Sequence, residues 1–423
     1  MRILWVKAGK LLPVDTGGKI RSYNLLRQLA ARHEVTLLSY YGGRRDEKYE
    51  REIAEHLPGA ETICTGAPEA APVSQGLDYL RHVASSAPYA VTKFTAPEVR
   101  RRVGAWLNER RCDVAVCDFL SASLNFPRDL KTPTVLFQHN VESALWERQA
   151  AHEPHPLKRV AFKLEAAKML AYERATVGRF HHTIAVSEHD REQMMLMTDP
   201  ARITVVPTGV DLRQYRAAAD TESDAASTLS ESAPLVMFLG SMDWEANIDG
   251  VDYFCRDIWP EVLAAVPGAR FRIVGRNPHP RVKKLASDSI EVTGTVPSVI
   301  DHLREAAVFV VPLRVGGGTR LKIFEAMAVG KAVVSTTIGA EGLDVTHGQD
   351  VLLADDAPTF ADNIVTLLRD TTIRREFEKA AAELAARHDW SVVVKRFEDA
   401  LAEAVKFKGE DATVRTEAVS VNA

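Results

Sequence analysis

The residues best suited to chemistry lie in the segment 311–330, where three consecutive glycines precede a helical pattern. Lys322 and Glu325 recur three residues apart, so a helix would place them on one face. Lys322 suits a diphosphate, and Glu325 can accept hydrogen bonds from both hydroxyls of a ribose. The backbone N–H groups that would complete a phosphate site belong to Gly316, Gly317, Gly318 and Thr319. An intrahelical Lys322–Glu325 pair over a packing turn is the alternative.

A second candidate site follows the first predicted strand, in residues 13–21. Gly17 and Gly18 stand where a helix would begin, which lets a ligand approach backbone N–H groups at the positive end of the helix dipole. This arrangement suits a phosphate or a sugar hydroxyl. A turn followed by a helix N-cap is the alternative.

Three further residues of interest also follow predicted strands. His139 lies in the polar stretch 138–142 and could donate to a substrate hydroxyl or act as a base, with a hydrogen-bonded structural histidine as the alternative. Gly240 opens the loop 240–244. Arg276 could bind a phosphate through its planar guanidinium, or it could form an ordinary surface ion pair.

These loops must be positioned by sheets, because short β-branched runs alternate with amphipathic stretches twice along the chain. The rhythm predicts an α/β protein with parallel sheets. Strands are expected at 2–7, 34–40, 113–117, 133–138, 182–186, 235–239, 270–274, 290–293, 307–311, 332–335 and 351–353. Helices are expected at 18–32, 44–56, 97–110, 157–180, 188–197, 248–265, 279–287, 298–306, 319–329, 358–369 and 372–387.

The chain also carries signs of its domain organisation. Residues 217–232 are polar and cannot bury themselves, which indicates an exposed loop near a domain boundary. A helix is expected to begin at Trp390. Residues 408–423 mix charged and small residues without periodicity and are predicted to form a flexible tail.

The composition excludes several classes of protein. The chain has 423 residues, of which 46% are hydrophobic, enough for two cores. Its net charge of −4 gives no electrostatic case for a nucleic-acid partner. The cysteines lack metal-ligand spacing, which predicts no metal site and suits a reducing compartment. With no secretory signal and no apolar run of bilayer length, the protein is predicted to be cytoplasmic.

Several enzyme motifs are missing from the sequence. No G-x-G-x-x-G follows the first strand, and no Gly-Lys pair precedes Ser or Thr. Neither G-x-S-x-G nor H-E-x-x-H occurs. These absences disfavour a Rossmann dehydrogenase, a P-loop protein and the simplest hydrolases and metalloproteases.

Taken together, the motifs resemble the family 4 glycosyltransferases, which are retaining, nucleotide-sugar-dependent enzymes with the GT-B fold of two facing Rossmann-like domains. The resemblance rests on the Gly17-Gly18 loop and on residues 205–211, 314–330 and 336–343. It implies an N-terminal acceptor-side domain over 1–205, with the C-terminal crossover helix 390–407 packing back onto it. A nucleotide-sugar-binding domain is implied over 206–389. The segment 13–21 looks like a subgroup associated with bacterial exopolysaccharide assembly.

The resemblance also implies roles for individual residues. Glu325 matches the second acid of an E-x7-E motif that holds the donor ribose, and Lys322 would face the diphosphate. The first acid of the motif falls at Gly317, so its contact with the donor sugar must come from backbone N–H groups or another residue. His139 occupies the position that contacts the sugar near the reacting carbon.

Relatives commonly place an Arg/Lys pair on the first two loops of the second domain. Here Ser241 and Asn247 stand near those places. Arg276 and Lys322 would substitute for the missing pair.

The implied reaction moves a sugar from a nucleotide-diphosphate donor to a hydroxyl acceptor with retention. Fixed cations and a helix N-terminus can stabilise the departing diphosphate, so neither a cofactor nor a metal is expected. Two other functions stay open. One is a sugar-nucleotide epimerase on the same architecture, and the other is a non-catalytic sugar-nucleotide-binding protein, which the glycine at position 317 favours.

The acceptor is expected to be a sugar or a lipid-linked molecule. Between His155 and His181 there are six lysines or arginines and two acids, interleaved with large apolar residues. This pattern predicts an amphipathic basic helix that touches the anionic inner face of a membrane. A solvated helix face is the alternative.

Overall fold

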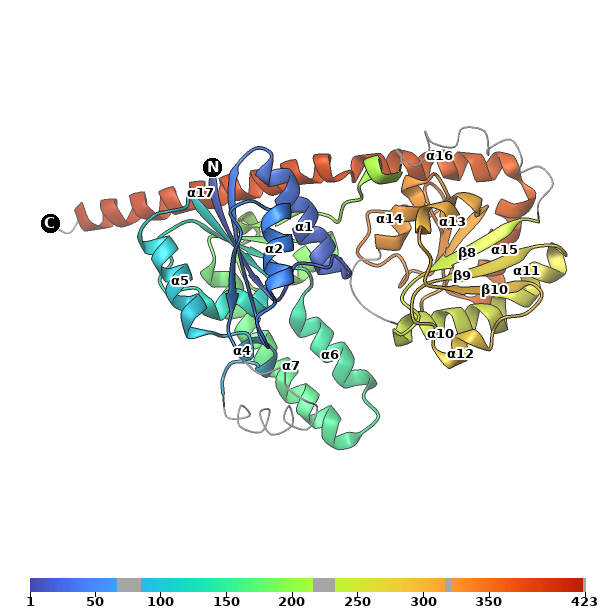
Figure 1. Ribbon diagram of the computed structural model, residues 1–423, viewed down its shortest axis with the longest axis horizontal. Helices are drawn as coiled ribbons and strands as arrows, with labels where there is room; N and C mark the ends of the chain where they lie inside the picture. The colour runs from blue at the N-terminus through green and yellow to red at the C-terminus, as the bar shows by residue number, and fades with distance from the viewer. Residues whose placement is uncertain (67–84, 216–232, 316–320, 421–423) are drawn as a thin grey trace. The chain divides into compact units, whose positions relative to one another are not determined.

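The computed structural model describes residues 1–66, 85–215, 233–315 and 321–420, with only the backbone for His152 and residues 408–420. The chain divides into two compact units (Figure 1). Unit 1 comprises Met1–Pro207 and Val394–Ala423, and unit 2 comprises Thr208–Val393. The chain thus crosses between the units after Pro207 and after Val393, where limits at 205 and 389 were expected.

Unit 1 is built on a parallel sheet whose described strands follow the order β3-β2-β1-β4-β5-β6-β7. Its strands are β1 (Arg2–Ala8), β2 (Glu34–Tyr41), β3 (Glu61–Cys64), β4 (Val114–Asp118), β5 (Thr134–Phe137), β6 (His182–Ala185) and β7 (Ile203–Val205). Its helical segments are α1 (Gly17–Ala30), α2 (Glu47–His56), α4 (Tyr89–Thr92), α5 (Pro97–Asn108), η1 (Leu120–Asn125), α6 (Glu142–His152), α7 (Pro156–Arg179), α8 (Glu188–Met194) and η2 (Pro200–Arg202).

Unit 2 contains a second parallel sheet, with the described order β10-β9-β8-β11-β12-β13. Its strands are β8 (Leu235–Leu239), β9 (Arg270–Val274), β10 (Ile290–Gly294), β11 (Val308–Val311), β12 (Ala332–Ser335) and β13 (Leu352–Leu353). Its helical segments are α10 (Glu245–Tyr253), η4 (Phe254–Ile258), α11 (Trp259–Ala265), α12 (Pro280–Lys283), α13 (Val299–Glu305), α14 (Leu321–Ala328), α15 (Ala357–Arg369) and α16 (Thr371–Arg387).

The central strands are almost continuously apolar because helices cover both faces of each sheet. All residues of β4, β5, β11 and β12 are buried. In each sheet the strand order reverses at one point, between β1 and β4 in unit 1 and between β8 and β11 in unit 2. Sheets of this kind bind ligands beyond the carboxyl ends of the strands at such a reversal. The loops after these four strands are therefore where binding sites are expected.

The last helix, α17 (Trp390–Ser420), starts in unit 2 and continues in unit 1. In unit 1 the Phe397 ring stacks on Trp5 at 5.3 Å and meets Phe137 edge-on at the same distance. In unit 2 its first residue is tied to the entering chain, because the Trp390 N–H donates to the Val210 carbonyl at 3.1 Å. A Cβ on Gly209 would lie 2.6 Å from the Trp390 ring, so only glycine fits there.

Some element limits differ from those expected. The predicted helix 248–265 is divided by η4, a π-helical segment that links α10 to α11. The predicted helix 188–197 ends at Met194. The expected tail from residue 408 begins inside α17, whose backbone stays helical to Ser420. Strand β3 and helix α6 were not predicted.

Candidate functional site

At the strand reversal of unit 1, buried polar side chains surround Asp118, the last residue of β4. Its Oδ2 accepts hydrogen bonds from Trp5 Nε1 at 2.8 Å, Lys7 Nζ at 3.0 Å and Ser22 Oγ at 2.7 Å. Burial alone would raise the pKa of Asp118, but Lys7, His139 and Ser22 together hold it well below the ordinary value. Asp118 is therefore an ionised carboxylate with saturated hydrogen bonding.

His139 follows β5 and points its Nε2 at Asp118 Oδ1, at 2.7 Å. Burial lowers the pKa of His139 to about 4, although Asp118 acts in the opposite direction. The ring is thus neutral near pH 7. Because an ionised carboxylate only accepts, Nε2 carries the hydrogen and Nδ1 carries the lone pair. Nδ1 is buried and makes no hydrogen bond within the described part of the chain.

The free lone pair of His139 lies against the start of α1. Gly17 and Gly18 form the first turn of this helix, as the sequence predicted. A Cβ built on Gly18 would lie 3.8 Å from His139 Nδ1, so the His139 ring borders the half-buried start of α1. Arg21, one turn further, is 4% exposed, and its burial lowers the pKa to about 10 despite the attraction of Asp190.

The loop that carries His139 is held by the helix pair that follows it. Buried Glu173 of α7 accepts hydrogen bonds from Gln138 Nε2 at 3.0 Å and from the backbone N–H of Glu142 and Ser143 at 2.9 and 3.0 Å. Burial, with repulsion from Glu173, raises the pKa of Glu142 to about 7. The hydrogen bonds from Glu142 and Ser143 to Glu173 therefore fix the start of α6 on a residue about 30 positions further along the chain.

At the strand reversal of unit 2, two cations converge on the loop after β8. Lys322 Nζ, from α14, donates to Asn247 Oδ1 at 3.0 Å and lies 4.3 Å from the centre of the Phe238 ring. Arg276 Nε, from the loop after β9, donates to Ser241 Oγ at 2.9 Å. The cations thus contact the two residues that stand near the usual Arg/Lys positions. Asn247 is 2% exposed and Arg276 is exposed.

Glycines after β8 and β9 allow close contacts at this site. A Cβ on Gly240 would lie 2.8 Å from Lys322 Nζ and 2.7 Å from Asn247 Nδ2. A Cβ on Gly275 would lie 1.7 Å from the Gly240 carbonyl oxygen. The two glycines therefore let the loops after β8 and β9 touch each other while leaving room for the lysine.

Glu325 lies one turn beyond Lys322 on α14. Burial raises the pKa of Glu325, and Lys322 and a hydrogen bond from Tyr215 act in the opposite direction. Arg314, earlier in the same segment, is held by Asp249 at 2.6 Å and lies over the Tyr253 ring. Gly316, Gly317, Gly318 and Thr319 fall outside the described residues, so their part in the site stays a prediction.

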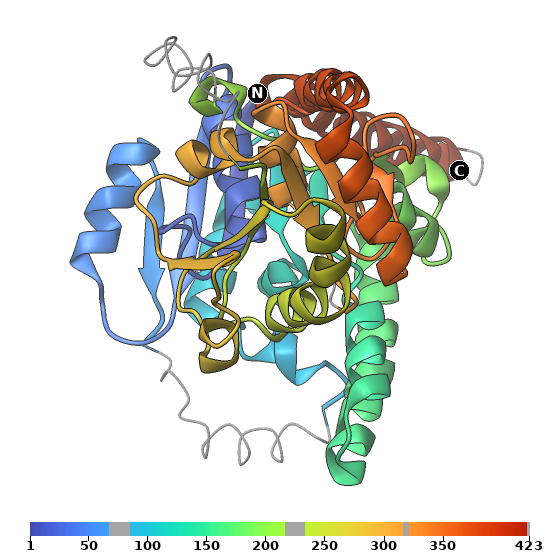
Figure 2. The ribbon, with the colours of Figure 1, turned by 90° about the vertical axis from the view of Figure 1, so that its right-hand side faces the viewer.

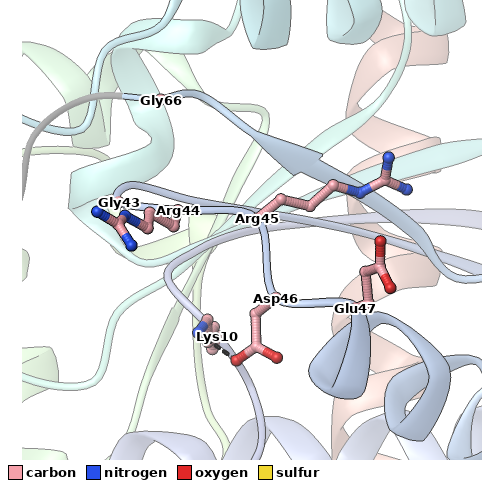
Figure 3. A pocket seen from close by; sticks show the side chains of 7 residues that line it. All are labelled: Lys10, Gly43, Arg44, Arg45, Asp46, Glu47 and Gly66. Atoms are coloured by element: carbon pink, nitrogen blue, oxygen red, sulfur yellow. Dashed lines mark hydrogen bonds and ion pairs between the residues drawn. The ribbon is translucent and has the colours of Figure 1, made fainter.

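A shallow pocket lies in unit 1 where β1, β2 and β3 end (Figure 3). Lys10 pairs there with Asp46 at 2.7 Å, while Arg45 turns away towards Glu50 at 2.9 Å. In Figure 3 the side chains of Arg44 and Arg45 point in different directions, so the cations do not converge on one point. The pocket is a set of solvated ion pairs, in contrast to the buried cluster around Asp118.

Several site residues were not found from the sequence. Lys7 and Asp118 are charged residues at the ends of otherwise apolar strands, which was the available signal. Tyr215, which hydrogen-bonds Glu325, carries no comparable local signal. Within the described ranges no group of three or more His, Cys, Asp or Glu could hold a metal ion. Independence from metals stays a prediction.

Comparison with known proteins identifies the class of this fold. HepE of Anabaena, solved in complex with UDP, superposes with a TM-score of 0.66 over 95% of this chain and all of its own, at 14% identity. The architecture is therefore GT-B. The profile described as "Glycosyltransferase Family 4" matches residues 16–214, and that described as "Glycosyl transferases group 1" matches residues 233–370. The chain belongs to the family 4 glycosyltransferases.

Curated relatives are similar over part of their length. A phosphatidyl-myo-inositol mannosyltransferase of Mycolicibacterium smegmatis is 28% identical over 52% of this chain and 56% of its own length. An uncharacterised 44.6 kDa protein in the cps region of Klebsiella pneumoniae is 26% identical over 33% of this chain and 39% of its own. Each alignment thus covers less than two thirds of the relative. None of the helices in the described part combines the length and apolarity needed to span a membrane.

Proposed function

We propose that this chain is a retaining glycosyltransferase that moves a sugar from a nucleotide-diphosphate donor to a hydroxyl acceptor. The proposal is carried by two cations from different elements at the strand reversal of unit 2: Arg276 donates to the Ser241 side chain, and Lys322 lies beside Gly240 and donates to the Asn247 side chain. A cation pair at such a reversal suits a diphosphate. HepE, solved with UDP, and the mannosyltransferase relative support a nucleotide-sugar donor.

In this proposal unit 2 holds the donor. Lys322 and Arg276 neutralise the diphosphate as it leaves, which is the main electrostatic demand of the reaction. Glu325 accepts hydrogen bonds from the ribose hydroxyls. Gly316, Gly317, Gly318 and Thr319 contribute backbone N–H groups to the phosphates.

In unit 1, the neutral ring of His139 carries a lone pair on Nδ1 beside Gly18. This lone pair accepts a hydrogen bond from a sugar hydroxyl. Asp118 is a positioning residue, because it fixes the tautomer and the orientation of the ring through Nε2. Gly17 and Gly18 leave the helix start open for a hydroxyl or a phosphate oxygen.

The chemistry balances without an added cofactor. The bond between the sugar C1 and the diphosphate oxygen breaks, and a bond forms between C1 and the acceptor oxygen. The acceptor hydroxyl gives its proton to the leaving phosphate oxygen on the same face of the sugar, which retains the configuration. The relative from a cps region supports a product that is a polysaccharide or another glycoconjugate.

A thermal-shift screen of the whole chain against UDP, GDP, ADP, CMP and their sugar conjugates tests the donor site. A ligand that binds only the folded state raises the melting temperature. One nucleotide class should raise it, and Glu325→Ala should abolish the rise. Stabilisation of Glu325→Ala equal to that of the parent protein would remove Glu325 from the site.

The identified sugar donor then distinguishes the remaining functions. Conversion of one sugar donor into another when no acceptor is present indicates an epimerase. Donor binding without turnover, with any acceptor extract, indicates a binding protein. We expect transfer of the sugar to the acceptor with an unchanged anomeric configuration, which NMR of the product measures.

A further inference from the structure

The beginning of α7 presents large apolar side chains to solvent. Leu157, Val160 and Leu164 are 87%, 57% and 52% exposed. Their spacing of three and four residues places them on one helical face, which we call the α7 stripe. Phe162 instead packs edge-on against Trp146 of α6 at 5.8 Å, and Met169 is buried. The stripe therefore lies apart from the face that α7 uses for packing.

Within α7, all charged side chains up to residue 164 are positive. Lys158, Arg159 and Lys163 are all exposed, and the sequence from 154 to 164 contains no acid. The next acid, Glu165, is buried and accepts the backbone N–H of Tyr89 at 3.0 Å, so it does not offset these cations at the surface. An apolar stripe accompanied by cations matches the surface of an anionic bilayer.

The hairpin of α6 and α7 extends from unit 1 and connects the α7 stripe to the loop of His139. The two helices run side by side in both views (Figures 1 and 2). α6 starts just after the His139 loop, and its 11 residues lead to the turn before α7. Glu173 of α7 holds the N-terminus of α6 through Glu142 and Ser143. The α7 stripe and the His139 loop are therefore connected through one helical hairpin, in which α7 is hydrogen-bonded to the start of α6.

We propose that the α7 stripe, with Lys158, Arg159 and Lys163, docks on the surface of a bilayer that contains anionic phospholipid. In this position α7 lies in the headgroup region with its apolar side chains inserted, as amphipathic surface helices do. A symmetric contact with a second copy is less favourable, because it would bring like charges together. The inference goes beyond the proposed transfer reaction and does not depend on it.

Sedimentation of the full chain with vesicles tests this surface. We expect binding to vesicles of phosphatidylglycerol and phosphatidylcholine, weakening with added salt, and little binding to phosphatidylcholine alone. Lys158→Glu with Lys163→Glu should weaken binding by at least about tenfold. Leu157→Ser with Leu164→Ser should weaken it by a similar factor. These side chains are exposed, so the melting temperature should stay close to that of the parent.

A matched control separates this surface from net charge. Lys48 and Lys379 have side chains that are 80% and 81% exposed on other helices, and reversing both changes the net charge equally. This control should keep vesicle binding. Absence of binding by the parent protein, or equal loss in the control, would overturn the proposal. A dimer that the Leu157 and Leu164 changes convert to a monomer would assign the stripe to a second copy instead. The vesicles carry neither donor nor acceptor, so failure here leaves the proposed transferase activity untouched.

Discussion

The two strand reversals carry polar clusters of opposite character. In unit 1, Asp118, Lys7, Ser22 and His139 are between 0% and 7% exposed, and three donors besides His139 converge on one carboxylate. In unit 2, Arg276 is exposed and Lys322 is half-buried. The first cluster is closed around its own charge, whereas in the second Arg276 is exposed and the Lys322 amine rests on Asn247 and on the Phe238 ring.

This difference suits the two clusters to different tasks. The cluster in unit 1 is suited to holding a side chain in position, and the cations of unit 2 are suited to binding an anion. A buried ion pair stabilises little compared with apolar packing, but removing one partner is costly because the other charge is left without compensation. Such a cluster suits the task of holding one ring, that of His139, in one tautomer. In unit 2, Arg276 and Lys322 donate hydrogen bonds to neutral side chains, those of Ser241 and Asn247, and both can attract an anion. We therefore expect changes in unit 1 to affect stability and changes in unit 2 to affect ligand affinity.

The largest effect is expected from Asp118→Asn. Because Lys7 would keep its charge in a buried position without a carboxylate, the free energy of unfolding should fall by about 3–5 kcal/mol. Urea denaturation followed by circular dichroism measures this change. Lys7→Met added to Asp118→Asn should recover part of the loss. A loss below about 1 kcal/mol would mean that the cluster is not closed in the way described.

The next effect concerns pH and His139. Its pKa is about 6.5 when unfolded and about 4 when folded, so between these values the unfolded chain binds the extra proton. The contribution of His139 to stability is therefore complete above about pH 6.5 and declines as the pH falls towards 4.

Comparison with His139→Gln isolates this contribution. The stability advantage of the parent over the variant should shrink by about 2 kcal/mol between about pH 7.5 and pH 5. Glu142, whose pKa is raised to about 7, acts in the opposite sense, so the parent curve alone is not diagnostic. Denaturant titrations at several pH values give the difference. Parallel curves for the two proteins would contradict a depressed histidine pKa.

In unit 2 the same kind of change should alter binding instead. Lys322→Met and Arg276→Gln should each weaken the affinity for the nucleotide diphosphate roughly tenfold to a hundredfold, the range for a hydrogen bond to a charged group. Isothermal titration calorimetry measures this. The melting temperature without ligand should change little.

Arg281→Gln is the control for these cations. Arg281 is also an exposed arginine of unit 2, and it pairs with Glu245 at 2.7 Å. Its removal should leave nucleotide affinity unchanged. If Lys322→Met unfolds the protein, or if Arg281→Gln loses as much nucleotide affinity, the contrast between the two clusters is wrong.

The sequence predicts much of this fold because two-sided burial leaves a clear mark. Strands β8, β9 and β12 have the expected limits. Strand β8 is a continuous apolar run, β9 places two arginines among three apolar residues, and β12 is apolar up to its last residue, Ser335. The loops after the strands could be selected for the same reason. Lys322 and Arg276 were found because cations beside glycines after a strand are a local pattern.

What the sequence does not reveal depends on distant contacts. Lys7 and Asp118 are separated by 111 positions, so no local pattern links them. Helix α6 was missed because Val141 provides no side-chain cap, and Glu173 of α7 supplies the bonds to its first N–H groups. Strand β3 was missed because it is only four residues long and none of them is fully buried. These contacts join residues that lie close together in the fold but far apart in the sequence.

The smallest effect is expected from Gly240→Ala, which tests the position of the Lys322 amine in unit 2. In Gly240→Ala the new methyl group would lie 2.8 Å from Lys322 Nζ and 2.7 Å from Asn247 Nδ2. Because these atoms end flexible side chains, they can move aside and the fold should persist. The displaced amine should then bind the nucleotide diphosphate a few-fold more weakly, since only its position changes. Gly268→Ala, where no atom lies within 4 Å of the added Cβ, should leave the affinity unchanged. Calorimetry that finds both variants equal to the parent would mean that the position of Lys322 Nζ seen here is not the position used for binding.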